Sequence, residues 1–204
     1  RGSLVKWEYT NTVSKITLSM CLADAGIVRV TYFPGAVPED EPSYAVSPGY
    51  SAPGAEIREY DEDGVHVVET SLLRIRIRTE EQKVDFYDVA TDEPLLTDEG
   101  GFGRESKDWT GDARVWIRKN LQETEHFFGL GDKPCALNLR GKYFSMWGAD
   151  HYDFHEESDP LYKSIPFFLS LRERKAYGLL FDNTCRSYFD FGATDEKVLS
   201  FGSF

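Results

Sequence analysis

The chain carries the stretch EHFFGLGDK at Glu125–Lys133, followed by GKYFSMWGAD at Gly141–Asp150 and DPLYKSIPF at Asp159–Phe167. Two phenylalanines before Gly129-Leu130-Gly131 predict a buried strand that runs into a tight turn. Glycine accepts backbone angles and close approaches that other residues do not. The alternation from Tyr143 to Trp147 predicts a half-buried strand.

The residues after this second strand, 148–159, predict a loop that mixes aromatic side chains with carboxylates. Loops on a rigid sheet scaffold are common places for binding groups. Rings beside carboxylates suit sugars, because C–H faces stack on rings and hydroxyls donate to carboxylates. The loop carboxylates could also form the acid–nucleophile pair of a glycosidase; they are Asp150, Asp153, Glu156, Glu157 and Asp159.

Four ordered motifs in this region resemble the N-terminal β-sandwich domain of family 31 glycoside hydrolases, the α-glucosidase and α-xylosidase family. The matching runs are FFGLGDK at 127–133, MWGAD at 146–150, DPLYKSIPF at 159–167 and YGLLFDN at 177–183. Four motifs in this order make the resemblance specific. It implies an all-β fold, an antiparallel β-sandwich of the galactose-mutarotase-like (supersandwich) type with little helix.

The resemblance also implies where the chemistry lies. In the family, the two catalytic aspartates belong to a (β/α)8 barrel that follows this domain, and the nucleophile's W-x-D-M-N-type motif is absent from these 204 residues. A barrel alone takes about 250 residues. We therefore expect residues 1–204 to be a single N-terminal domain of an α-glucosidase-type glycoside hydrolase. It would have no catalytic residue of its own, and its barrel would be encoded downstream.

Substrate contacts are expected on the loop. The aspartate that ends the family's second motif hydrogen-bonds sugar hydroxyls, and Asp150 matches it. Trp147 and Tyr152 are predicted to line the same mouth, facing an α-glucoside oligosaccharide; the alternative is that both rings pack under the loop. Ala149 stands where family members often carry Arg or Thr, which indicates more room. The isolated chain should expose an apolar patch where the barrel docks, and so self-associate.

The rest of the chain predicts short strands and no helix. Hydrophobic residues alternate with polar ones or cluster at 13–20, 27–33, 65–70, 73–78, 84–88 and 115–118. In the run 73–78, Arg74, Arg76 and Arg78 are expected to pair with neighbouring acids. The proline-rich segment 34–53 is expected to be an irregular surface segment.

The amino-acid composition argues against some classes of binding partner. Asp and Glu number 35 against 23 Lys and Arg, and a net charge of −12 argues against nucleic acid or an anionic membrane. No apolar run is long enough to span a bilayer. Three widely spaced cysteines argue against a disulfide framework, and no signal peptide is visible, so we predict a cytoplasmic location.

Particular histidine and serine residues suggest other functions. His151 and His155 have the spacing of zinc ligands on a helix, but they fall in a loop without a third ligand, so no metal or cofactor is expected. Ser164 lacks the G-x-S-x-G elbow of a serine hydrolase. An aldose-1-epimerase-like enzyme remains open if His126, His151 or His155 lies beside a carboxylate. A non-catalytic carbohydrate-binding module that stacks sugars on aromatic rings also remains open.

Overall fold

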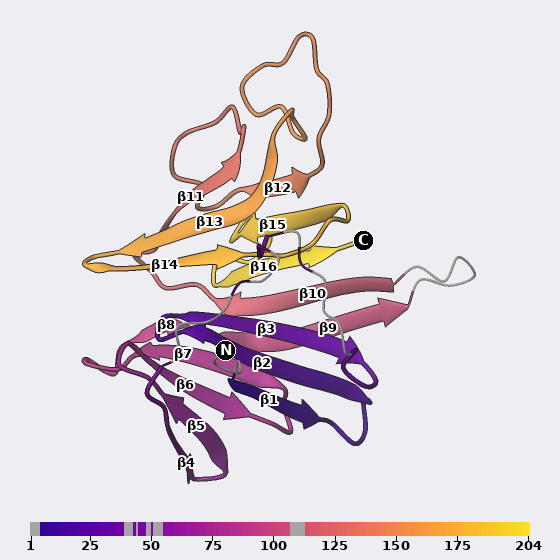
Figure 1. Cartoon of the computed structure of the whole chain (residues 1–204). Coiled ribbons are helices and arrows are strands. Elements are labelled where there is room, and N and C mark those ends of the chain that lie inside the picture. The colour runs from indigo at the N-terminus through magenta and orange to yellow at the C-terminus, as the bar shows by residue number, and fades with distance from the viewer. Residues whose placement is uncertain (1–4, 39–42, 44, 48–49, 51–54, 107–112) are drawn as a thin grey trace. The chain divides into compact units, whose positions relative to one another are not determined.

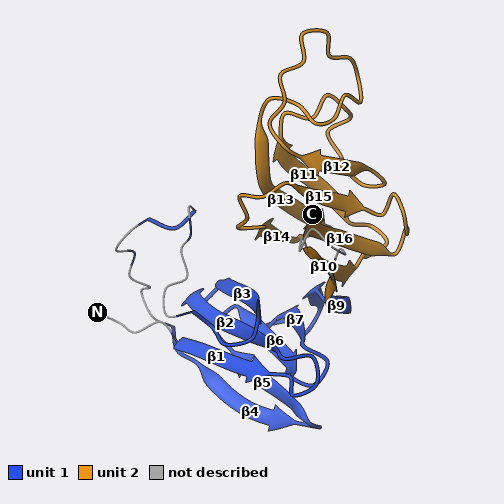
Figure 2. Ribbon diagram, turned by 90° about the vertical axis from the view of Figure 1, so that its right-hand side faces the viewer, with its two compact units in different colours: residues 1–101 blue, residues 102–204 orange. Residues whose placement is uncertain are grey.

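The computed structural model describes residues 5–38, 43, 45–47, 50, 55–106 and 113–204. This part contains sixteen strands and no helix, so the all-β prediction is confirmed. It therefore also contains no helix able to cross a membrane. The chain divides into unit 1, residues 1–101, and unit 2, residues 102–204 (Figure 2). A single domain over 1–204 stays a prediction, and most of the proline-rich stretch after residue 38 lies outside the described residues.

Unit 1 is built from two antiparallel sheets (Figure 1). The three-stranded sheet has the order β1-β2-β3 and the five-stranded sheet the order β4-β5-β6-β7-β8. The strands are β1 (Val5–Thr10), β2 (Ile16–Asp24), β3 (Ile27–Pro34), β4 (Arg58–Glu62), β5 (Val65–Glu69), β6 (Leu73–Arg78), β7 (Lys83–Asp88) and β8 (Pro94–Leu96).

The core of unit 1 is aliphatic and draws on both sheets. Leu18 and Met20 of β2 cluster with Val68, Ile75, Ile77 and Val84 of the five-stranded sheet, all with 0% exposure. Val13, expected in the same strand as Leu18, lies in a turn and is 90% exposed. The Asn11 side chain accepts the backbone N–H groups of residues 13 and 14 there, a local bond that favours a turn over a strand.

The arginines of β6 have acidic partners, as expected. Ile75 and Ile77, between them, are fully buried, so the strand has one apolar and one charged face. The hydrogen bond from Arg74 lowers the pKa of Glu69. The pairs are Arg74 with Glu69 at 2.7 Å, Arg76 with Glu62 at 2.9 Å, and Arg78 with Asp85.

Unit 2 also combines a five-stranded and a three-stranded sheet, with the orders β12-β15-β16-β10-β9 and β11-β13-β14. Strand β9 begins in the last residues of unit 1 and continues into unit 2. The strands are β9 (Asp98–Ser106), β10 (Ala113–Asn120), β11 (His126–Gly131), β12 (Tyr143–Met146), β13 (Ser164–Arg172), β14 (Lys175–Leu180), β15 (Ser187–Phe191) and β16 (Val198–Ser203).

The core of unit 2 is aromatic. Phe127 of β11 and Phe168 of β13 come from the small sheet, and Phe189 and Phe191 of β15 come from the large one; all four have 0% exposure. The ring centroid of Phe168 lies 5.5 Å from that of Phe127 and 5.2 Å from that of Phe191. The contact between Phe168 and Phe191 joins the two sheets, which is the packing of a β-sandwich.

The glycines of the FFGLGDK motif lie inside strand β11, so the predicted turn is wrong, while the predicted close approach is confirmed. The register with β13 shifts between Gly129 and Gly131, as in a β-bulge. A Cβ on Gly129 would lie 2.6 Å from the Phe167 carbonyl oxygen, and one on Gly131 would lie 2.5 Å from the Lys163 carbonyl oxygen. Glycine marks turns and bulges alike, so sequence alone did not separate them.

Gly131→Ala should therefore destabilise unit 2 more than Gly141→Ala. Both glycines have positive φ, +85° and +76°, but nothing lies within 4 Å of a Cβ on Gly141. The Gly141 variant should lose only the conformational term, about 1–2 kcal/mol. The Gly131 variant should lose about 1–3 kcal/mol more, since β11 must move away from β13. Urea unfolding measures both, and equal losses would refute the close-contact explanation.

Candidate functional site

The predicted loop is present. Residues 147–163 connect β12 to β13 without forming a strand or helix. Figure 1 shows them as the orange loop that extends beyond the ends of these two strands. The loop therefore begins and ends on the two different sheets of unit 2, whose aromatic core fixes both strands.

Internal contacts give the loop a shape of its own. The Ala149 N–H donates to the Leu161 carbonyl oxygen at 3.3 Å, and the Tyr162 hydroxyl donates to the His151 carbonyl oxygen. The ring of Phe154 meets that of Tyr162 edge-on, with centroids 6.4 Å apart. Leu161 is 4% exposed and anchors the returning segment. A loop with close ends and internal packing is typical of functional Ω-loops.

The three predicted substrate-contacting residues lie on this loop with their side chains open to solvent. Asp150 is exposed, and among the described residues its carboxylate has no hydrogen-bond partner. Trp147 is 51% exposed and Tyr152 is 97% exposed. The Tyr152 ring is therefore not packed under the loop, while about half of Trp147 is covered, and contact of either ring with a substrate stays a prediction. A carboxylate and two accessible rings within six residues are available to a ligand.

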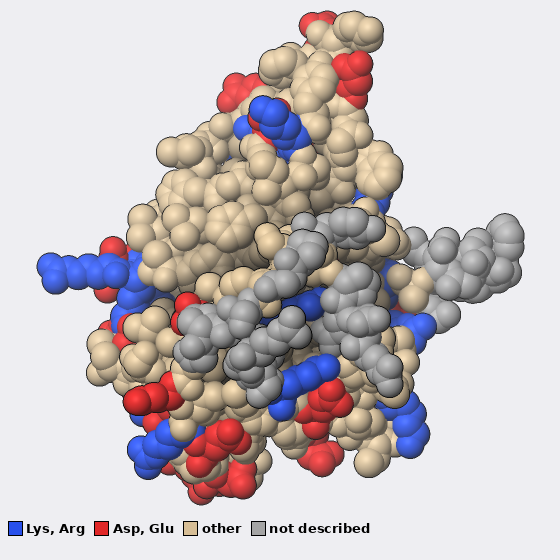
Figure 3. All heavy atoms as spheres, in the orientation of Figure 1, with Lys and Arg blue, Asp and Glu red and all other residues tan. Residues whose placement is uncertain are grey.

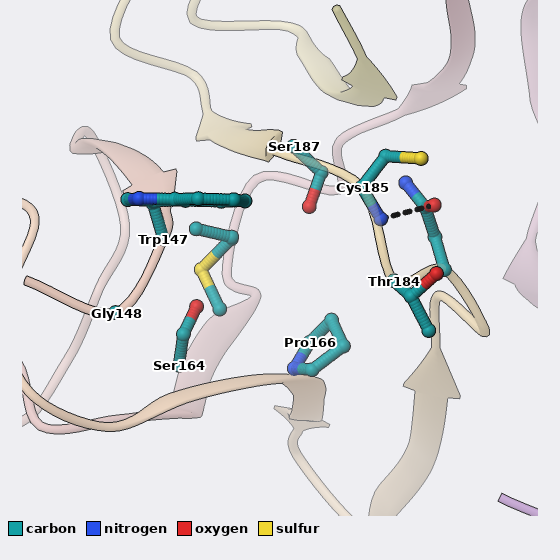
Figure 4. Close-up of a pocket in the computed structure, with 9 residues that line it drawn as sticks. Trp147, Gly148, Ser164, Pro166, Thr184, Cys185 and Ser187 are labelled. Carbon is teal, nitrogen blue, oxygen red and sulfur yellow. Dashed lines mark hydrogen bonds between the residues drawn. The ribbon is translucent and has the colours of Figure 1, made fainter. Parts of the chain in front are cut away.

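A pocket of about 400 Å³ adjoins the start of the loop (Figure 4). Trp147 forms one wall, and the hydroxyls of Ser164 and Ser187 point into the space between Trp147 and Pro166. Asn183 also lines it; its Oδ1 accepts the Cys185 N–H at 2.9 Å, while its buried Nδ2 finds no partner among the described residues. In the sequence Asn183 is only the last residue of the YGLLFDN motif, and no local pattern predicts its place in this wall.

The three histidines considered for an epimerase-like centre do not lie beside a carboxylate; the histidine that does is His66 of unit 1, whose Nδ1 lies 3.0 Å from Asp61 Oδ1. His126, His151 and His155 are all exposed. The partner of His126 Nδ1 is the Asn138 amide at 2.9 Å, and that of His155 Nδ1 is the Glu156 carbonyl oxygen at 2.7 Å. Within the described ranges, none of the three contacts a carboxylate side chain. Nor does any group of three or more His, Cys, Asp and Glu side chains in those ranges have a geometry that could hold a metal ion.

One buried carboxylate, Glu125, was not singled out from the sequence. It is 2% exposed and accepts hydrogen bonds from Ser170 Oγ at 2.5 Å and the Tyr177 hydroxyl at 2.8 Å. Burial, and then the charge of Glu125, raise the pKa of Tyr177 well above its usual value, so the phenol remains a donor. A carboxylate enclosed in this way cannot reach a sugar. The Ser170 and Tyr177 donors lie 45 and 52 residues away, and no local pattern reveals them.

A family model that matches most of the chain shows which family it belongs to. The sequence model described as the glycosyl hydrolase 31 N-terminal galactose mutarotase-like domain matches residues 17–190. The chain belongs to this family. The family 31 resemblance of the four motifs and the predicted sandwich type are thereby confirmed.

Curated relatives of this family 31 domain include two α-glucosidases. Alpha-glucosidase 2 of Bacillus thermoamyloliquefaciens is 41% identical over 100 residues, which cover 48% of this chain and 13% of that protein. The α-glucosidase of Saccharolobus solfataricus is 34% identical over 87 residues, covering 42% of this chain and 13% of that protein. The alignments thus take in only a small part of either relative.

Solved structures agree on the fold. A family 31 dextranase of Flavobacterium johnsoniae, complexed with isomaltotriose, superposes with a TM-score of 0.81 at 28% identity, over 98% of this chain and 24% of that one. A family 31 α-xylosidase of Xanthomonas citri gives 0.70 at 20% identity, over 93% of this chain and 19% of that one, a likeness of fold alone. In both enzymes the family 31 domain is a minor part of a longer polypeptide.

Proposed function

We propose that this chain lends a substrate-contacting rim to a catalytic (β/α)8 barrel in the same polypeptide, within an α-glucosidase-type hydrolase. The rim is the loop 147–163, and Asp150 is its principal contact. The observation that carries the proposal is the exposed Asp150 carboxylate, which has no hydrogen-bond partner in the described part of the chain and lies on a loop whose two ends belong to different sheets of one packed core. Two relatives are named α-glucosidases, and a family 31 dextranase was solved with isomaltotriose.

The chemistry of the rim fits a neutral oligosaccharide. The Asp150 carboxylate accepts hydrogen bonds from sugar hydroxyls, and the charge strengthens those bonds. The exposed faces of Trp147 and Tyr152 offer stacking surfaces to the C–H face of a pyranose. The substrate class is an α-glucoside oligosaccharide. The barrel supplies the acid and the nucleophile, and this chain supplies orientation at the mouth of the site.

The outer face of the β11-β13-β14 sheet supports docking onto such a barrel. Ile165, Phe167, Leu169 and Leu171 of β13 and Leu180 of β14 are 40–51% exposed. The register places Phe128 and Gly178 beside Leu169, and His126 and Ala176 beside Leu171, so these two rows carry no Lys, Arg, Asp or Glu side chain. In Figure 3 the atoms over β13 and β14 are almost all tan. Contiguous apolar faces mark interaction sites, and we assign this one to the catalytic part of the polypeptide.

Charging this face should reduce self-association of the isolated chain. The chain alone should scatter light as oligomers, and Ile165→Glu with Leu169→Lys should shift it toward the monomer mass, because the charges would need desolvation on contact. Val13→Lys is the matched control, since Val13 is a single apolar residue in unit 1 with 90% exposure. A monomeric parent chain that binds no hydrophobic dye would contradict the docking assignment. So would a single dimer of fixed mass at all concentrations, in place of a concentration-dependent mixture of oligomers, because a fixed dimer lost in the charged variant would assign the face to a second copy.

The function is tested by domain replacement. This chain would replace the matching domain of Bacillus thermoamyloliquefaciens α-glucosidase 2, and hydrolysis of an aryl α-glucoside and of maltose would be measured. We expect the hybrid to be active and the 204-residue chain alone to be inactive. Hydrolysis by the chain alone would place the catalytic carboxylates within it, against the proposal.

Two assays on the isolated chain separate the remaining alternatives. Accelerated mutarotation of glucose would favour the epimerase-like enzyme, and saturable maltose binding without a barrel would favour the carbohydrate-binding module. We expect neither, because the rim alone offers few contacts. A cytoplasmic location remains part of the proposal and is testable by fractionation.

A further inference from the structure

Lys133, the last residue of the FFGLGDK motif, is a buried cation. Its side chain is 3% exposed. The Lys133 Nζ donates to the Ser145 carbonyl oxygen at 2.9 Å and to Asp159 Oδ1 at 2.5 Å. The Phe144 ring lies beneath it, 5.3 Å from Nζ to the ring centroid. A buried ammonium requires such a counter-ion and acceptors, because its water is gone.

The partner carboxylate completes a closed arrangement around one residue of β12. Asp159 Oδ2 accepts the Ser145 N–H, while Lys133 donates to the Ser145 C=O. Strand β12 lies at the edge of its sheet, and among the described strands β15 is its one neighbour in that sheet. The ion pair therefore satisfies the outward backbone groups of Ser145 in place of another strand. Charge-assisted hydrogen bonds of this kind fix direction as well as distance.

This arrangement holds together the two chain segments at the base of the candidate loop, near Ser145 and Asp159, which we call the neck of the loop. Ser145 lies two residues before the loop begins, and Asp159 lies near its end, so the pair ties the departing chain to the returning chain. The Gly131 close approach to Lys163 lies next to Lys133 in the same motif. The glycines bring β11 against β13, and Lys133 then reaches across to β12. The motif thus connects both ends of the loop to the scaffold.

We propose that Lys133 and Asp159 are positioning residues that hold the loop, and with it Asp150, in place at the rim. Their effect on substrate rests on the proposed function; their effect on the loop does not. Neither residue touches the substrate. Lys133 is enclosed, and the Asp159 carboxylate is taken up by Lys133 and Ser145, so both act through the loop's neck.

Amide hydrogen exchange of the 204-residue chain tests the positioning directly. The readouts are the Ala149 N–H and the Glu157 N–H, which donate to the Leu161 and Pro134 carbonyl oxygens. Lys133→Met and Asp159→Asn should each accelerate the exchange of these two amides by about 10-fold or more. This is the effect expected when at least one charge-assisted hydrogen bond is lost. Amides of β15 and β16 should keep their parent rates.

The matched control is Arg78→Met. It removes another ion pair with a buried carboxylate, Asp85, but in unit 1. It should leave the exchange rates of the Ala149 and Glu157 amides unchanged. Unchanged loop amides in Lys133→Met and Asp159→Asn would refute the positioning role. So would equal acceleration throughout unit 2, or failure of both variants to fold, since either would show a role in the whole unit.

A second readout connects the neck to substrate. In the hybrid α-glucosidase, Asp159→Asn should lower kcat/KM by about 10-fold when Asp150 is present and have little further effect with Asp150→Ala, because interacting groups are non-additive. Full additivity would refute action through Asp150. If Asp150→Ala has no effect by itself, the proposed function fails, while the exchange experiment still decides whether the pair holds the loop.

Discussion

Replacing Phe168 with alanine is expected to lower the free energy of unfolding of unit 2 by about 3–5 kcal/mol. The Phe168 ring is fully buried and contacts rings from both sheets. Its centroid lies 5.5 Å from that of Phe127, 5.8 Å from that of Phe189 and 5.2 Å from that of Phe191. Alanine would leave a cavity that none of these rings can fill without leaving its own contacts.

The neighbouring residue supplies the control for this prediction. Phe167 is 42% exposed on the opposite face of β13, so Phe167→Ala should cost less than about 1 kcal/mol. Urea unfolding, followed by circular dichroism and by tryptophan fluorescence, measures both variants. Similar losses for Phe167 and Phe168 would show that the two sheets of unit 2 are not joined through the aromatic core.

Asp150→Ala is expected to lower kcat/KM of the hybrid α-glucosidase by about 10- to 100-fold. A hydrogen bond to a charged group contributes about 1.5–3 kcal/mol, and each 1.36 kcal/mol is tenfold in rate. The kcat/KM of Asp150→Asn should lie between that of the parent hybrid and that of Asp150→Ala, because the amide keeps one acceptor but loses the charge. Initial rates with maltose over a range of concentrations give kcat and KM separately.

Asp153→Ala is the matched control, since Asp153 is another exposed carboxylate three residues further along the same loop. It should change kcat/KM by less than about 3-fold, the usual range for surface substitutions. If Asp153→Ala costs as much as Asp150→Ala, general loop charge rather than one directed contact governs substrate binding. If neither has an effect, the rim does not touch substrate.

Local sequence patterns predicted the strands well, but they predicted the contacts between strands poorly. Alternation identified the buried face of Ile75 and Ile77 and the strand that begins at Tyr143, because side-chain direction along a strand has a period of two. The motif resemblance placed Asp150 on an exposed loop. The Gly129–Gly131 bulge was taken for a turn, since the same residue serves both.

The features missed all depend on residues distant in sequence. Lys133 and Asp159 are 26 positions apart, and Glu125 and Tyr177 are 52 apart. The local sequence around these residues does not predict the contact within either pair, because the contact depends on which strands become neighbours in the fold. Phe167 and Phe168 are alike in sequence, and only the packing of the small sheet on the large one decides which is buried.

The division of the chain into two halves has a consequence for biosynthesis. The aliphatic cluster of unit 1 draws all of its members from residues before 102, and the aromatic cluster of unit 2 draws all of its members from residues after it. A ribosome releases a polypeptide from its amino end, so all described members of the aliphatic cluster are synthesised before the second half has been translated. Nascent chains of this protein can therefore mature stepwise, with half of the molecule already sheltered from aggregation and proteolysis while the other half emerges.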